Sequence, residues 1–139
     1  MPVGWLRVTA GYSATPLYRK LGIKRGHVVA LLGAPPGWSI GLPEGVTLRH
    51  RADGSPDLIV AFFDQRARLE RRLPVLLRAL RSDGSLWIAW PRKAAGRVND
   101  ISENDLRDII LPTGLVDTKV AALDNDWSGL KFMWRKELR

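Results

Sequence analysis

Three runs of apolar residues, each about as long as a strand, constrain the fold of this chain most strongly. They cover residues 27–32, 58–63 and 86–90, and within them apolar side chains predominate without regular polar alternation. Continuous apolar runs of this length are typical of strands that are buried on both faces, as in a parallel sheet. The sequence therefore predicts a central sheet with other segments packed on both of its sides.

Helical segments separate these strands. A long helix is predicted to follow Asp64, which can serve as its N-cap, and Pro74 is expected to kink or split that helix. The buried face of the long helix is predicted from its leucines at helical spacing, namely Leu69, Leu73, Leu76, Leu77 and Leu80. A shorter helix is expected to begin at Pro16 with Thr15 as its N-cap, and another is expected to be capped by Ser102.

The remaining strands complete the sheet. A more polar strand is expected over residues 46–51, and residues 115–123 and 130–136 are predicted to pair as an antiparallel hairpin through the turn-rich residues 124–129. Strands that alternate with helices favour parallel pairing through right-handed crossovers. We therefore predict one three-layer, Rossmann-like α/β domain over residues 11–139, preceded by a loose arm at residues 1–10. Its sheet is mainly parallel, has about six strands and ends in the antiparallel hairpin.

Composition excludes several kinds of site. The chain has no cysteine, which excludes disulfides and thiolate ligands, and its two histidines are too few for a histidine-based zinc site. We therefore predict no metal site, and no residue is assigned a catalytic role. Because no apolar run reaches the roughly 20 residues of a membrane span and no signal peptide opens the chain, we expect a cytoplasmic protein without membrane contact.

The net charge of +8 is unevenly distributed. Arginines concentrate between residues 66 and 81, on the long predicted helix, and the first acidic residue of the chain is Glu44. A basic surface favours anionic partners such as nucleic acid. A solvated helix face, with arginine content set by genome composition, explains the same pattern, so both interpretations stay open.

Five stretches of the chain carry a resemblance to a known family. They are residues 11–17, 20–24, 31–35, 86–93 and 127–132. In these stretches the chain, from about Gly11 to its end, resembles a bacterial family catalogued as domain of unknown function 3052. The order of the predicted elements also resembles a shortened class I methyltransferase sheet, whose last two strands form a hairpin with the final strand antiparallel. The resemblance implies a methyltransferase-like fold, and it implies no established activity.

Methyl transfer makes three demands on the carboxyl edge of such a sheet. These are a glycine-rich turn that approaches the cofactor closely, a carboxylate after the second strand and a flat apolar site for adenine. In the turn after residue 32, Pro35 and Pro36 supply no N–H donors. The second strand ends in Arg49, His50 and Arg51, where a carboxylate is expected. The sequence therefore predicts no cofactor and keeps S-adenosylmethionine as the alternative.

Ligands of open α/β sheets bind outside the carboxyl ends of the strands. Candidate ligand-binding residues at that edge are Gly33, Pro35, Gly37, Trp38, Asp64, Trp90, Lys93 and Trp127. For the tryptophans the alternative is packing under loops, and for Lys93 it is an ion pair with Asp64 or Asp126. Arg49 and Arg51 are candidates for binding an anion, although charges on an edge strand also prevent pairing between sheets.

Three functions follow from these observations. The leading interpretation is a binding domain, non-catalytic or with a cryptic activity, that takes a small anionic or nucleotide-like ligand or a protein partner at the carboxyl edge. The first alternative is an S-adenosylmethionine-dependent methyltransferase with an atypical glycine turn. The second alternative is a basic nucleic-acid-associated protein that uses the helix over residues 66–81 and the basic N-terminal segment. Replacing Trp127 with alanine is expected to spare folding and weaken ligand binding.

Overall fold

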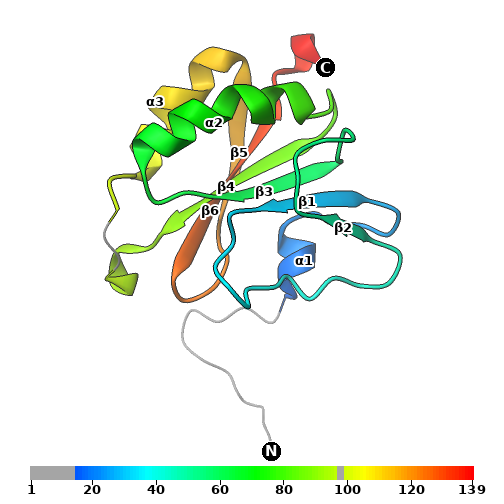
Figure 1. Cartoon of the computed structure of the whole chain (residues 1–139). Coiled ribbons are helices and arrows are strands. Elements are labelled where there is room, and N and C mark those ends of the chain that lie inside the picture. The colour runs from blue at the N-terminus through cyan, green and yellow to red at the C-terminus, as the bar shows by residue number, and fades with distance from the viewer. Residues whose placement is uncertain (1–14, 97–98) are drawn as a thin grey trace, which may run out of the picture.

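A six-stranded sheet forms the centre of the computed structural model, which describes residues 15–96 and 99–139. Its strands are β1 (Val28–Leu32), β2 (Thr47–Arg49), β3 (Leu58–Phe62), β4 (Ser85–Pro91), β5 (Leu115–Ala122) and β6 (Trp127–Trp134). They lie in the order β2-β1-β3-β4-β6-β5, and β6 alone runs against the others (Figure 1). This arrangement confirms the predicted α/β fold with a mainly parallel sheet and a closing antiparallel hairpin.

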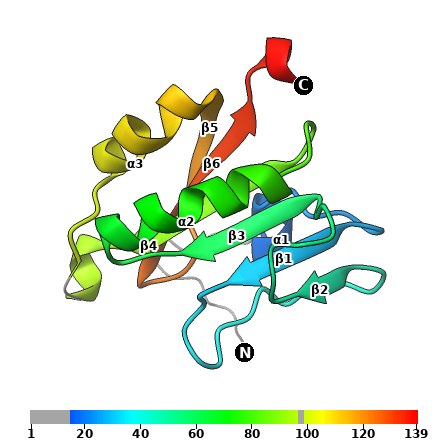
Figure 2. The same ribbon diagram turned by 45° about the horizontal axis from the view of Figure 1, so that its top comes forward.

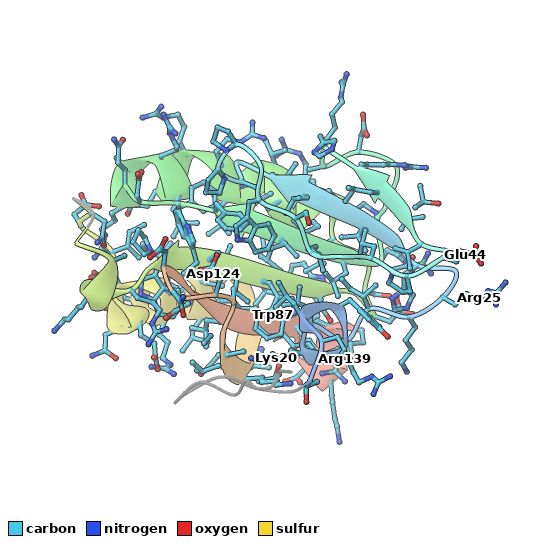
Figure 3. All side chains as sticks on the ribbon, turned by 90° about the horizontal axis from the view of Figure 1, so that it is seen from below. Lys20, Arg25, Glu44, Trp87, Asp124 and Arg139 are labelled. Atoms are coloured by element: carbon cyan, nitrogen blue, oxygen red, sulfur yellow. The ribbon has the colours of Figure 1, made fainter. Side chains whose placement is uncertain are left out.

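Segments on both faces bury the sheet. The helices α2 (Arg66–Ala79) and α3 (Glu103–Ile110) cover one face, and α1 (Leu17–Lys20) lies on the other face (Figures 1 and 2). Loop residues 33–46 pack on the same side as α1, and together they enclose the indole of Trp87, which donates a hydrogen bond of 3.1 Å to the carbonyl of Leu21 (Figure 3). Because both faces are covered, β3 is buried along its whole length.

The long helix α2 differs from prediction in two respects. The helix is not split at Pro74, which is exposed, while Leu73 and Leu76 on either side of it are buried. Its N-cap is Gln65 rather than Asp64, and the Gln65 side chain makes no cap hydrogen bond. The carboxylate of Asp100 accepts the backbone N–H of Arg66 at 2.6 Å instead, so a distant segment supplies the cap.

Two further boundaries were predicted incorrectly. Pro16 rather than Thr15 is the N-cap of α1, and no side chain caps that helix. In the hairpin, β6 begins at Trp127, so only residues 123–126 connect the two strands. Trp127 therefore belongs to a strand and not to the turn. Three short 3₁₀ helices complete the described part of the chain: η1 (Lys93–Ala95), η2 (Leu111–Thr113) and η3 (Lys136–Leu138).

The predictions for the N-terminal residues 1–14 are not tested by the structure. The arm expected at residues 1–10, and the start of the expected domain at residues 11–14, lie outside the described residues. Within residues 15–96 and 99–139, every helix is too short or too polar to pass through a lipid bilayer.

Candidate functional site

The carboxyl ends of β1, β3 and β4 meet at one edge of the sheet, as Figure 2 shows for β1 and β3. At the end of β1 the chain turns at Gly33, whose φ of +71° is a conformation that glycine adopts readily. A Cβ atom on Gly33 would lie 3.1 Å from the carbonyl oxygen of Phe62. Any side chain at this position would crowd that carbonyl, so the close approach of the turn to the end of β3 favours glycine.

Aromatic side chains fill the space beside this turn. The ring of Phe62 is approached edge-on by Trp38, with centroids 4.7 Å apart, and by Trp127, with centroids 4.9 Å apart. Phe62 and Trp127 are buried. Edge-to-face packing at these separations is favourable and leaves little room for another flat ring. The crevice beside the glycine turn is thus occupied by the protein's own side chains.

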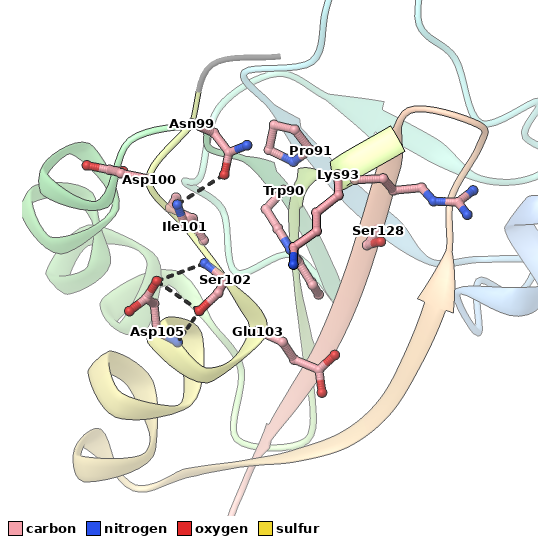
Figure 4. A pocket seen from close by; sticks show the side chains of 11 residues that line it. Trp90, Pro91, Lys93, Asn99, Asp100, Ile101, Ser102, Glu103, Asp105 and Ser128 are labelled. Carbon is pink, nitrogen blue, oxygen red and sulfur yellow. Dashed lines mark hydrogen bonds between the residues drawn. The ribbon is translucent and has the colours of Figure 1, made fainter. Parts of the chain in front are cut away.

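An open pocket of about 740 Å³ lies next to this crevice, beyond the end of β4. Figure 4 shows that η1, the segment before α3 and the first turn of α3 surround it. Its lining includes two of the predicted site residues, Trp90 and Lys93, together with Glu103 of α3 and Ser128 of β6. The volume falls within the range of about 300–1,000 Å³ that is typical of small-molecule sites.

The α3 side of the pocket is held by a hydrogen-bonded helix start. The Ser102 hydroxyl accepts the backbone N–H of Asp105 at 3.2 Å, and the Asp105 carboxylate accepts the backbone N–H of Ser102 at 2.8 Å, which completes a capping box. Arg66 of α2 adds a bond of 2.7 Å from its Nη1 to the other Asp105 oxygen. The bonds from Ser102, with a smaller contribution from Arg66, lower the pKa of Asp105 below its ordinary value.

Two polar groups of the pocket have no partner among the described residues. The side chain of Trp90 is only 8 % exposed, yet its indole Nε1–H donates to no acceptor in residues 15–96 and 99–139. The exposed ammonium of Lys93 likewise makes no hydrogen bond or ion pair within those residues. Trp90 lines an open pocket, so its indole donor is available to a ligand that carries an acceptor.

The other predicted site residues lie outside this pocket. Gly37 and Pro35 shape the turn after β1, where the Pro35 carbonyl accepts the backbone N–H of Trp38 at 3.0 Å. The Asp64 carbonyl accepts the backbone N–H of Asp100. The structure thus brings Gly33, Pro35, Gly37, Trp38 and Trp127 to one part of the edge, and Trp90 and Lys93 to the pocket beside it.

The two arginines proposed for anion binding join neither group. Arg49 lies in the exposed edge strand β2, level with Ala30 and two residues before β1 ends. Arg51 forms an ion pair of 3.3 Å with Asp53, and both side chains are exposed. Sequence analysis also missed the segment that closes the pocket, whose lining residues are Asn99, Asp100, Ile101 and Glu103. The signal that indicates it is the capping box at Ser102, because a helix that follows a parallel strand begins at the carboxyl edge.

The sheet order and the reversed last strand are those of a Rossmann-like, methyltransferase-like fold, and comparisons with solved structures agree. A magnesium protoporphyrin IX methyltransferase from Synechocystis, solved with bound S-adenosylmethionine, matches with a TM-score of 0.59 and 13% identity over 86% of this chain and 74% of that one. A methyltransferase dependent on S-adenosylmethionine from Aquifex aeolicus matches with a TM-score of 0.57 and 16% identity over 86% and 88% of the two chains.

A third structure, LepI in complex with S-adenosylmethionine, matches with a TM-score of 0.53 and 13% identity over 86% of this chain. The match spans only 39% of the LepI chain. A comparison with protein-family models finds no match, and a comparison with curated proteins finds none either. The resemblance to domain of unknown function 3052 therefore stays a sequence-based expectation.

These structures correct one prediction. The sequence pointed to no cofactor, whereas two of the three matched structures of this fold hold S-adenosylmethionine. The prediction judged the cofactor only by the turn after β1 and the end of β2. It did not consider the pocket that residues of β4 and α3 line along the same edge.

Proposed function

We propose that this protein is a methyltransferase that uses S-adenosylmethionine and binds it at the carboxyl edge of its sheet. The observation that carries the proposal is the open pocket of about 740 Å³ at that edge, in a sheet whose last strand is reversed. The matched structures support it, because their fold is the same and several are named as methyltransferases. A non-catalytic binding domain has less support, because it does not account for the similarity of this fold to structures that are named as methyltransferases.

The residues of the pocket suit the cofactor in kind. S-adenosylmethionine carries a carboxylate, an ammonium group, a sulfonium centre, ribose hydroxyls and an adenine ring. The pocket offers the ammonium of Lys93, the carboxylate of Glu103 and the unpaired indole N–H of Trp90. When bound, the cofactor supplies an electrophilic methyl group, and the open side of the pocket leaves a path for a methyl acceptor.

A binding measurement on the whole chain tests this proposal. S-adenosylhomocysteine is the better probe because it cannot transfer a methyl group, and a ligand that binds only the folded protein raises its melting temperature by mass action. We expect a concentration-dependent rise with S-adenosylhomocysteine and S-adenosylmethionine, and no rise with adenosine or methionine alone at the same concentrations. A melting temperature unchanged by both cofactors up to millimolar concentration would contradict the proposal.

The outer face of α2 favours a second candidate function, association with nucleic acid. Four exposed arginines on this helix make no ion pair with any residue in the described ranges: Arg68, Arg71, Arg72 and Arg78. Arg71 and Arg72 follow Arg68 by three and four positions, and Arg78 follows Arg72 by six, so all four lie on the side of α2 away from its buried leucines. Unpaired arginines along one helix face suit the phosphates of a nucleic acid backbone.

The salt dependence of binding to a fluorescein-labelled single-stranded RNA tests this second candidate. Changing the four α2 arginines to glutamine should abolish the binding and its salt dependence. The matched control changes four exposed cations at the opposite edge of the sheet, namely Lys24, Arg25, Arg135 and Lys136. Equal loss in both quadruple variants would show that net charge alone is responsible, and the α2 face would then have no specific role.

A further inference from the structure

The candidate cofactor site has two possible positions along the carboxyl edge, the crevice beside the glycine turn and the open pocket beyond β4. We infer that S-adenosylmethionine binds in the pocket, with Lys93 on its carboxylate, and that the crevice beside Gly33 serves only to join β1 to the hairpin. This inference rests on the proposed function, and it assigns the cofactor to residues that lie outside the turn.

Packing at the crevice argues against a ligand there. Trp38, Phe62 and Trp127 are in edge-to-face contact. The Trp38 indole Nε1–H is not available to a ligand, because it donates a hydrogen bond of 2.8 Å to the carboxylate of Asp124. Insertion of an adenosyl group would have to break these contacts and that hydrogen bond.

The polar groups around the crevice are also of the wrong kind. Pro35 and Pro36 have no N–H to offer to a carboxylate. The three residues after β2 are His50, Arg51 and Ala52, and Arg51 forms an ion pair with Asp53, the first carboxylate beyond the strand. A ribose with two hydroxyls is usually held by a carboxylate acceptor, and the end of β2 supplies none within residues 47–52.

The pocket has the complementary set of groups. Lys93 is a cation without a partner among the described residues, and a carboxylate ligand would satisfy it with a charge-assisted hydrogen bond. Figure 4 shows its side chain extending over Trp90 toward the start of α3, where Glu103 lies. Glu103 also forms an ion pair with Arg107 in the next turn of α3, which holds its carboxylate in position.

Trp90 supplies the most specific element. The residue is largely buried and lines the pocket, while its Nε1–H lacks an acceptor in the described parts of the chain. An apolar ring next to an unpaired donor matches a ligand that is flat and carries acceptor atoms, as adenine does. Lys93, Glu103 and Trp90 together fit a ligand with separated negative and positive groups and an aromatic ring.

Isothermal titration of the full chain with S-adenosylhomocysteine tests the assignment through four single variants. Lys93→Met should weaken binding by about tenfold or more, because a charge-assisted contact is lost. Lys93→Arg should restore most of it. Trp90→Phe keeps an aromatic side chain, with a smaller ring, and removes the donor, so we expect a loss of about three- to tenfold. Lys24→Met, the matched change at an exposed lysine far from the pocket, should bind as the wild type does.

Trp38→Phe separates the two positions. It removes the indole donor at the crevice and leaves the pocket unchanged, so binding should stay within about twofold of the wild type. Wild-type affinity in Lys93→Met and Trp90→Phe, with a loss in Trp38→Phe, would overturn the assignment and leave the proposed function intact. Absence of binding in the wild type would overturn both. Because Lys93 is exposed, its variants should fold normally, and their melting temperatures without ligand verify this.

Discussion

The indole Nε1–H of Trp38 donates a hydrogen bond of 2.8 Å to the carboxylate of Asp124, although 86 positions separate the two residues. The bond joins the loop after β1 to the tip of the β5–β6 hairpin. The other oxygen of Asp124 accepts the backbone N–H groups of Asp126 and Trp127, both at 2.8 Å. One carboxylate therefore shapes the hairpin turn and fastens it to the glycine turn.

Asp124→Ala should destabilise the protein by about 1–3 kcal/mol, because three donors lose their common acceptor. Urea denaturation followed by far-UV circular dichroism measures this loss. Asp126→Ala is the control: its exposed side chain has no partner within the described ranges, and we expect a change below about 0.5 kcal/mol. Equal losses in the two variants would mean that the Asp124 side chain has no special role in the turn.

Trp127→Ala should destabilise the fold by about 3–5 kcal/mol, as truncation of a large core side chain does. This reverses the expectation from sequence, which placed Trp127 in the hairpin turn and expected its replacement to spare folding. The residue is 5 % exposed and packs edge-on against Phe62. Equilibrium unfolding in guanidinium chloride tests the prediction. A loss below about 1 kcal/mol would contradict the core position.

Two neighbouring leucines of α2 should respond differently to truncation. Leu76 is fully buried against the sheet, whereas Leu77 is only partly buried. Leu76→Ala should therefore lower the free energy of unfolding by about 2–5 kcal/mol, and Leu77→Ala by clearly less. Thermal or chemical denaturation of the two variants measures the difference between their free energies of unfolding. If Leu77→Ala is the more damaging change, the orientation of α2 on the sheet is wrong.

The capping box of α3 should make stability depend on pH in the acid range. The pKa of Asp105 is lowered in the folded protein, chiefly by hydrogen bonds from Ser102, so the unfolded chain takes up the proton first as the pH falls. The stabilisation is complete above the ordinary pKa of 3.8 and is lost as the pH falls below it, toward the lower folded value.

Denaturation midpoints between about pH 5 and pH 2.5 measure this dependence. Asp105→Asn should be less stable than the wild type at neutral pH and should lose less stability across the acid window. Asp108→Asn, which alters an exposed carboxylate of the same helix that has no partner among the described residues, should keep the wild-type slope. An unchanged slope in Asp105→Asn would exclude the capping box as its source.

The sheet was predictable because burial on both faces leaves a direct mark on composition. The apolar runs at β1, β3 and β4 have the length and composition of strands that are buried on both faces. The proximity of the glycine turn to the hairpin turn was also predictable from the sequence. The parallel strands end at the carboxyl edge of the sheet, and the antiparallel strand β6 begins there. The start of β6 was missed because Trp127, Ser128 and Gly129 combine a residue type typical of strands with two typical of turns.

The pocket was less accessible to sequence reasoning. Its α3 side includes the polar residues Asn99 and Asp100, which lie in an irregular segment, and Glu103, the first residue of α3. Their place is fixed by tertiary contacts that no local pattern encodes, such as the bond from the Arg66 backbone N–H to Asp100. The unpaired state of Trp90 likewise depends on which acceptors the fold brings near it.

A crystal structure of the full chain grown with S-adenosylhomocysteine tests the central claim most directly. The account predicts electron density for the ligand in the pocket between Trp90, Lys93 and Glu103, with the contacts among Trp38, Phe62 and Trp127 preserved. Density lying over Gly33 with those aromatic rings displaced would contradict the assigned position. A pocket that holds only water at saturating ligand would contradict cofactor binding altogether.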